Sequence, residues 1–156
     1  MKATFFFKIA LMSAFALGAM TVVSCSKDKP EPKPYADYFG TWKYEFAGGW
    51  GQVTLSADEL IFVDNNGDGF TLVDLTWTPK TNSAGAHITT YPTGYKITGK
   101  LTADKRFGPL KADGTVANIG DIAVDYWYIS TDKMSLRWGA MYTSDHEANA
   151  GPYVKQ

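Results

Sequence analysis

The stretch Thr41-Trp42-Lys43-Tyr44-Glu45-Phe46 alternates large aromatic rings with charged side chains. In an extended strand, successive side chains point to opposite faces. The three aromatic residues therefore share one face, which we expect to be buried, while the lysine and the glutamate share the face that meets solvent. The stretch predicts the first strand of a β domain.

The same period of two continues along the chain, interrupted by Gly, Asn, Asp and Pro residues that favour turns. Short, regularly spaced strands are typical of a sandwich or a barrel, and the lack of long crossovers favours an up-and-down order. We therefore expect an all-β fold, a small antiparallel up-and-down barrel of eight or nine strands. Strands are predicted at residues 41–46, 52–56, 59–64, 70–77, 95–102, 121–130 and 133–142, with weaker ones at 86–91 and 115–117 and a turn or closing edge in the tail.

Residues 1–24 have the features of an export signal. Lys2 and Lys8 supply positive charge, and residues 9–23 are uncharged and mostly apolar, but short for a membrane span of about 20 residues. The segment ends in Val22-Val23-Ser24-Cys25, which resembles the lipobox of bacterial lipoproteins. The resemblance implies a lipoprotein signal peptide over residues 1–24, cleavage before Cys25 and lipid attachment at the Cys25 thiol.

Cys25 is the only cysteine of the chain, so its acylation would leave no thiol for disulfides or metal sites and would anchor the protein in a membrane. Residues 25–37 form a tether, in which three alternate prolines favour extended backbone. Lys27-Asp28 partly resembles the charged export tag of Bacteroidetes-type surface lipoproteins. We expect an exported outer-membrane lipoprotein, on the periplasmic face or at the cell surface, with residues 38–156 as its single barrel domain.

The charge of the mature part excludes one class of partner. Without residues 1–24 the chain holds 13 basic and 16 acidic side chains, a formal charge of −3. Such a mildly acidic domain offers no basic surface for nucleic acid. The expected partners of a monomeric protein of this kind are the membrane, through Cys25, and a small hydrophobic ligand or a glycan.

Gly40-Thr41-Trp42 resembles the Gly-x-Trp opening of lipocalins and of their bacterial lipocalin-like relatives. The resemblance implies a barrel whose base is closed by Trp42 and whose interior binds a small, partly apolar ligand. Lipocalins also place a basic residue near the last strand against that tryptophan. Arg137 is the candidate, although strict alternation puts it on the face opposite Leu136 and Trp138.

The predicted inner face is rich in aromatic rings that carry a polar group. Such rings can fill a small barrel, or they can line a pocket with polar fittings, since a barrel of about eight strands is close to the size that holds one small ligand. Both possibilities stay open at this stage. The candidate ligand-binding residues are Trp42, Tyr44, Tyr95, Tyr126, Tyr128 and Trp138.

A second reading is a non-catalytic interaction module with a filled barrel. Trp50 lies between glycines in an expected turn over residues 47–51, and Trp127 shares a predicted outer face with Asp125. Exposed Trp50 and Trp127 would then bind a glycan or a protein, with Trp77 as a further candidate.

Residues 64–69 match the first half of a calcium-binding loop, but Leu75 stands where the loop needs a bidentate glutamate. A hairpin turn is the favoured interpretation. The two histidines, His87 and His146, lack the paired spacing of a zinc site, and no G-x-S-x-G motif is present. We therefore expect no metal, no cofactor and no catalytic activity.

Overall fold

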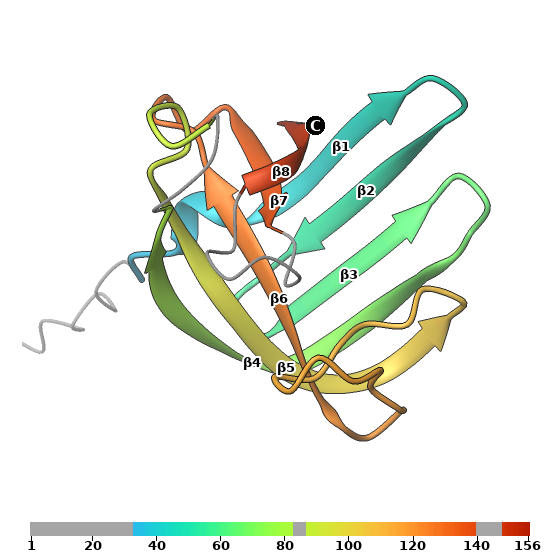
Figure 1. The fold of residues 1–156 in the computed structure, drawn as a ribbon. Coiled ribbons are helices and arrows are strands. Elements are labelled where there is room, and N and C mark those ends of the chain that lie inside the picture. The colour runs from blue at the N-terminus through green and yellow to red at the C-terminus, as the bar shows by residue number, and fades with distance from the viewer. Residues whose placement is uncertain (1–32, 83–86, 140–147) are drawn as a thin grey trace, which may run out of the picture. The chain divides into compact units, whose positions relative to one another are not determined.

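The computed structural model describes residues 33–82, 87–139 and 148–156, so Cys25, the signal segment and most of the tether lie outside the described residues. The described chain forms a closed antiparallel barrel in which strands pair in sequence order and the last pairs with the first (Figure 1). The expected all-β up-and-down barrel is confirmed. A 3-10 helix η1 (Ala36–Tyr38) precedes eight strands: β1 (Gly40–Phe46), β2 (Gly49–Leu55), β3 (Glu59–Asp64), β4 (Gly69–Thr81), β5 (Thr93–Lys105), β6 (Ile122–Ile129), β7 (Ser135–Gly139) and β8 (Ala148–Lys155).

The tail supplies the closing strand, β8, which pairs with β1 at Trp42–Lys155 and Lys43–Val154. The two weaker predicted strands do not form. Residues 87–91 are a turn, in which the amides of Thr90 and Tyr91 donate to the His87 carbonyl. Residues 115–117 contribute only an isolated bridge at Val116.

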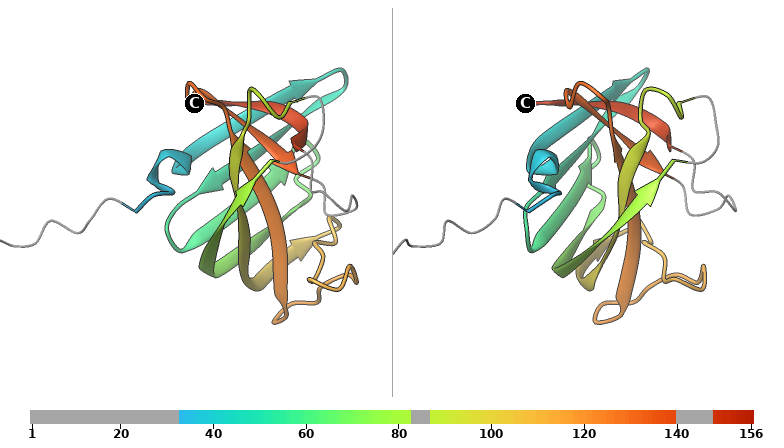
Figure 2. Two further views of the ribbon diagram at one scale, coloured as in Figure 1. Left: turned by 60° about the vertical axis from the view of Figure 1, so that its left-hand side comes forward. Right: turned by 90° about the vertical axis from the view of Figure 1, so that its left-hand side faces the viewer.

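The barrel has two ends that differ in their connections. The base is the end where η1 enters and where the β2–β3 and β6–β7 turns and the β4–β5 connection lie. The opposite end, called here the cavity end, carries the β1–β2 and β3–β4 hairpins and the long β5–β6 connection. In Figure 1 the base lies on the left and the cavity end on the right, and in the right-hand view of Figure 2 the base faces the viewer.

The core runs from the base into the middle of the barrel. Trp42 is fully buried, its indole N–H donates to the Tyr38 carbonyl at 2.8 Å, and the Lys155 ammonium lies 5.1 Å from its ring centroid. Burial of each large apolar side chain contributes about 1.5–3 kcal/mol. The side chains in the core cluster of Trp42 with exposure of 2 % or less are Tyr38, Val53, Leu55, Leu60, Leu72, Ile97, Leu101, Ala123, Trp127 and Leu136.

A group of aromatic rings closes the base against the incoming chain. Tyr35 stacks on Trp77 with ring centroids 4.7 Å apart, and Tyr38 meets Tyr95 edge-on at 5.2 Å. The Trp77 indole donates to the Ala57 carbonyl at 3.1 Å. These rings fill the base by contacting one another.

Strand β6 is buried on both faces from Ala123 onward. Its Trp127 pairs with Trp138 and belongs to the barrel core, whereas Tyr126 and Tyr128 form a separate outer cluster with Tyr91 and Val124. The prediction that Tyr126 and Tyr128 face the interior and Trp127 faces outward is therefore wrong. Because the turn at residues 87–91 covers the outer face, both faces of β6 are buried. The alternation of side chains along this strand therefore does not indicate which face lies inside the barrel.

Candidate functional site

Two neighbouring cavities open at the cavity end, with volumes of about 250 Å³ and about 260 Å³. Four residues line both of them: Phe70, Phe107, Asp125 and Trp138. The smaller one also contacts Pro109, Leu110 and Val124. The other residues that line the larger one are Tyr44, Phe46, Trp50, Gly51, Phe62, Asp64, Trp127 and Tyr153. Each cavity is somewhat smaller than the ~300–1,000 Å³ typical of ligand pockets, so a small molecule fits best.

The cavities form where the sheet separates. Strand β6 pairs with β7 over only three residues, from Trp127 to Ile129. Its first half instead meets the β5–β6 connection, and the Val124 amide donates to the Leu110 carbonyl at 2.8 Å. Asp125 lies just before the paired segment, so its side chain reaches the space that β7 no longer fills.

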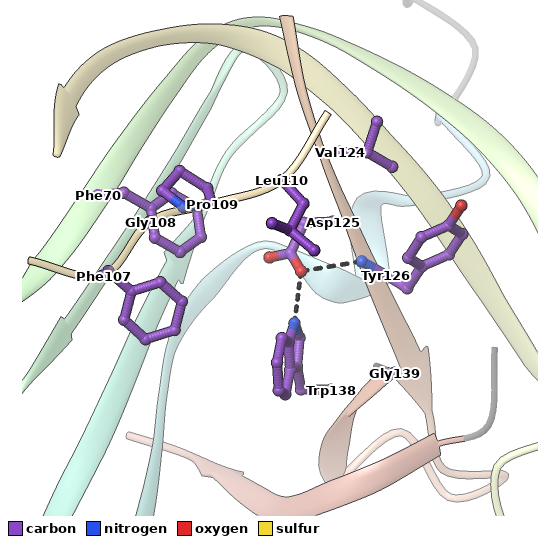
Figure 3. Close-up of a pocket in the computed structure, with 10 residues that line it drawn as sticks. All are labelled: Phe70, Phe107, Gly108, Pro109, Leu110, Val124, Asp125, Tyr126, Trp138 and Gly139. Atoms are coloured by element: carbon purple, nitrogen blue, oxygen red, sulfur yellow. Dashed lines mark hydrogen bonds between the residues drawn. The ribbon is translucent and has the colours of Figure 1, made fainter. Parts of the chain in front are cut away.

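The Asp125 carboxylate is the polar centre of this site and is only 6 % exposed. Its Oδ1 accepts the Trp138 indole N–H at 2.5 Å and the Tyr126 amide at 3.0 Å. Its Oδ2 accepts the Trp127 indole N–H at 2.7 Å. Figure 3 shows the carboxylate between Trp138 and the β5–β6 connection, with the Tyr126 ring turned away from it.

Burial raises the pKa of Asp125 to about 6, while the three hydrogen-bond donors oppose that rise. Desolvation disfavours the charged form of a carboxyl group, and donors to the carboxylate favour it. Burial likewise raises the pKa of Tyr153, with the negative charge of Asp125 as a further cause. The site therefore holds an acid that titrates close to neutral pH.

Aromatic rings form the walls. Phe107 lies 4.6 Å from Phe62 and 5.1 Å from Phe70 between ring centroids, and Tyr44 lies 5.5 Å from Tyr153. Phe107 belongs to the β5–β6 connection. Its backbone amide donates a hydrogen bond to Oδ1 of Asp104, near the end of β5, at 3.2 Å. The connection thus places an apolar ring, 39 % exposed, at the mouth of the barrel.

The predicted ligand-binding residues do not gather in one place. Tyr44 and Trp138 line the cavities. Trp42 and Tyr95 pack at the base instead. Tyr126 contacts the smaller cavity from the outer cluster that it shares with Tyr128.

The predicted surface tryptophans also differ from expectation. Trp127 is 1 % exposed, so its assignment as an exposed binding ring is wrong. Trp50 lies within β2 rather than in a turn and is half-buried. It pairs with Glu45, and the Lys43 ammonium lies 5.4 Å from its ring centroid.

The basic residue against Trp42 is Lys155, not Arg137. Alternation along β7 is as expected, because Leu136 is buried in the barrel core and Arg137 lies on the other face, with its guanidinium 5.3 Å from the Tyr91 ring centroid. Lys155 lies in the polar tail with Gly151-Pro152, whose sequence predicts either a turn or a closing edge and so does not identify a residue against Trp42.

The turn at residues 64–69 is built from its own hydrogen bonds. Asp64 Oδ1 accepts the amides of Asn66 at 2.8 Å and Asp68 at 3.0 Å, and Gly67 has φ +72°. This is the geometry of the hairpin turn that the sequence favoured. Among residues 33–82, 87–139 and 148–156, no three His, Cys, Asp or Glu side chains are grouped to hold a metal ion; His146 lies outside these ranges.

Several cavity residues were not singled out from the sequence. Phe62 and Phe70 lie in strands that were expected, but nothing in their period marks them as cavity walls. Phe107 lies in an irregular segment without a period. The sequence predicts Asp125 on the outer face of its strand, which is wrong. Its position as a lone acid between aromatic residues is the one sequence feature that marks it.

Comparison with protein-family models, curated proteins and solved structures returned no significant match for this chain. Within the described part of the chain, no helix has the length and apolar character needed to cross a membrane.

Proposed function

We propose that the protein is an exported, membrane-anchored lipoprotein whose lipocalin-like barrel binds a small, partly apolar ligand at the cavity end. The observation that carries the proposal is the pair of cavities that share Phe70, Phe107, Asp125 and Trp138. Apolar walls with a few convergent polar groups are the usual make-up of a ligand site. The proposal assigns no reaction to the protein.

The placement of Lys155 supports the lipocalin-like part of the proposal. The Gly-x-Trp resemblance implies a basic residue near the last strand against Trp42, and Lys155 of β8 lies 5.1 Å from that ring. Together with the up-and-down strand order, this gives the resemblance a second feature beyond the three residues at 40–42.

Ligand binding is tested by native mass spectrometry of the full-length chain, purified without added ligand. We expect a bound mass that is lost in Gly51→Val, because a side chain at this buried position would point toward the Tyr153 hydroxyl and the Phe62 ring. Gln52→Val, the next residue on the opposite face of β2, is the matched control. Recovery of only unliganded protein from several cell extracts would contradict the proposal.

Membrane anchoring is tested separately. We expect Cys25→Ala to abolish incorporation of labelled palmitate and to release the protein from the membrane fraction, since two acyl chains already give stable anchoring. Normal labelling of the variant would refute lipid attachment at Cys25.

The non-catalytic interaction module expected from the sequence loses Trp127, which is buried, and Trp77, which stacks on Tyr35 at the base. Trp50→Ala tests the remaining candidate. We expect this variant to keep its fold, because Trp50 is only half-buried, and to bind ligand more weakly, because Trp50 also lines the larger cavity.

A further inference from the structure

Among the described residues, the buried acid in the cavities has no cationic partner. Asp125 lines both of them, and Asp64 lines the larger one. No lysine, arginine or histidine is among the described residues that line either cavity. Buried charges in proteins are ordinarily paired, because an isolated charge in an apolar environment is expensive. A positive charge is the group that this site lacks.

The carboxylate also keeps room for a further hydrogen bond. An ionised carboxylate has about four lone-pair positions. Three donors are recorded for Asp125, two at Oδ1 and one at Oδ2. The remaining position is at Oδ2, on a side chain that contacts both cavities.

The walls suit a cation as well. The faces of Trp, Tyr and Phe rings attract a cation within about 6 Å of the ring centroid. Trp138, Phe107 and Phe70 surround Asp125 in both cavities, and Tyr44 and Tyr153 extend the larger one. Rings beside a single acid are the combination that binds an alkyl- or arylammonium group.

We propose that the ligand carries a protonated amine that donates to Asp125 Oδ2 and lies against the rings of Trp138 and Phe107. This inference rests on the proposed function and names the chemical class of the ligand. The volumes of about 250 and 260 Å³ limit the amine to a small alkyl or single-ring substituent. An anionic ligand would meet Asp125 and Asp64 as like charges.

A neutral ligand is the main competitor, since a protonated Asp125 can donate a hydrogen bond to it. The pKa of about 6 leaves the carboxyl mostly ionised at pH 7.5. A neutral ligand would then leave the buried charge unpaired, whereas an ammonium group would pair it. The two possibilities predict opposite preferences among molecules of the same shape.

The test uses three probes of similar shape that differ in charge: 2-phenylethylamine, 2-phenylethanol and 3-phenylpropanoate. Binding to the full-length chain is measured by isothermal titration calorimetry at pH 7.5. A hydrogen bond to a charged group contributes about 1.5–3 kcal/mol, so we expect the amine to bind about 10- to 100-fold more tightly than the alcohol. The propanoate should bind most weakly.

Asp125→Asn keeps the size of the side chain and removes its charge. We expect the amine to lose its advantage in this variant, while binding of the alcohol changes by no more than a few-fold. Asp113→Asn, which removes an acid from the exposed β5–β6 connection, is the matched control and should keep the wild-type preference. The comparison of probes on the unaltered chain holds whether or not Asp125→Asn folds.

The outcomes separate this inference from the proposed function. Equal or tighter binding of the alcohol would overturn the amine inference and leave the ligand cavity in place. Failure of all three probes, with no bound mass in native mass spectrometry, would overturn both. A preference for the amine that survives in folded Asp125→Asn would show that another group selects the charge, and would also overturn the inference.

Discussion

The two ends of the barrel use the same residue types in opposite ways. At the base, the indole N–H groups of Trp42 and Trp77 donate to backbone carbonyls, and neighbouring rings pack face to face or edge to face. At the cavity end, the indoles of Trp127 and Trp138 both donate to Asp125, and the rings around them leave open volume.

This difference in hydrogen bonding distinguishes the end that stabilises the fold from the end that we propose as the ligand site. Indoles bonded to neutral carbonyls satisfy polar groups of the fold itself. Indoles bonded to a buried carboxylate hold a charge that destabilises the empty protein, because desolvation opposes ionisation. Natural proteins accept such local destabilisation mainly at functional sites. The comparison therefore supports the proposal that the base stabilises the fold and the cavity end binds the ligand.

The largest expected effect is the removal of the ring at the base. We expect Trp42→Ala to lower the free energy of unfolding by about 3–5 kcal/mol, because the ring is fully buried. Phe107→Ala should cost about 1–2 kcal/mol, because that ring is only partly buried. Urea denaturation of both variants measures the difference, and equal costs would break the comparison between the two ends.

The next effect is a pH dependence that comes from the buried acid at the cavity end. The pKa of Asp125 is raised to about 6 in the folded protein, so the folded state binds this proton more tightly than the unfolded state. The contribution of Asp125 to stability is therefore greatest below about pH 4, falls as the pH rises toward 6, and is then constant. At about 1.4 kcal/mol per pKa unit, the loss is on the order of 3 kcal/mol.

Asp125→Asn isolates this contribution when its unfolding free energy is compared with that of the unaltered chain from pH 4 to pH 7. Within the described part of the chain, the other ionisable groups that line the cavities are Tyr44, Asp64, Tyr126 and Tyr153, from β1, β3, β6 and β8. They are common to both proteins, so the difference reports Asp125. A difference that does not vary with pH would contradict the burial of an ionisable acid at this site.

A smaller effect compares one indole from each end. Trp138→Phe removes a donor to a charged carboxylate, and we expect a cost of about 1.5–3 kcal/mol at pH 7. Trp77→Phe removes a donor to a backbone carbonyl, and about 0.5–1.5 kcal/mol is expected. Thermal unfolding at pH 7 and pH 4 distinguishes them further, since only the cost of Trp138→Phe should fall when Asp125 is protonated. If the cost of Trp138→Phe were the same at both pH values, as for Trp77→Phe, the expected difference between the two ends would be absent.

The base was largely predictable from the sequence, and the cavity end was not. The alternation around Trp42 identifies a buried face because the opposite face is charged and meets solvent. Along β6 this reasoning fails, because the turn at residues 87–91 covers the outer face and both sets of side chains are buried. An acid in such a strand is then predicted to face solvent. The indole groups that donate hydrogen bonds to Asp125 come partly from β7, which the alternation along β6 does not reveal.

Two other features depend on contacts between distant segments. Lys155 reaches Trp42 only because the tail closes the barrel against β1. Phe107 lines the cavities only because the irregular β5–β6 connection folds back over the mouth. Neither segment has a period that a sequence can reveal, so the site could be assembled only from the folded chain.

We propose that the buried acid Asp125 pairs with a cation on the ligand. The most informative test follows the side-chain carboxyl signal of Asp125 by NMR across a pH titration, with and without saturating 2-phenylethylamine. We expect a pKa of about 6 in the free protein and a lower pKa in the presence of the amine, because a neighbouring positive charge favours the ionised form. A pKa that the amine leaves unchanged, or an ordinary value in the free protein, would contradict the account.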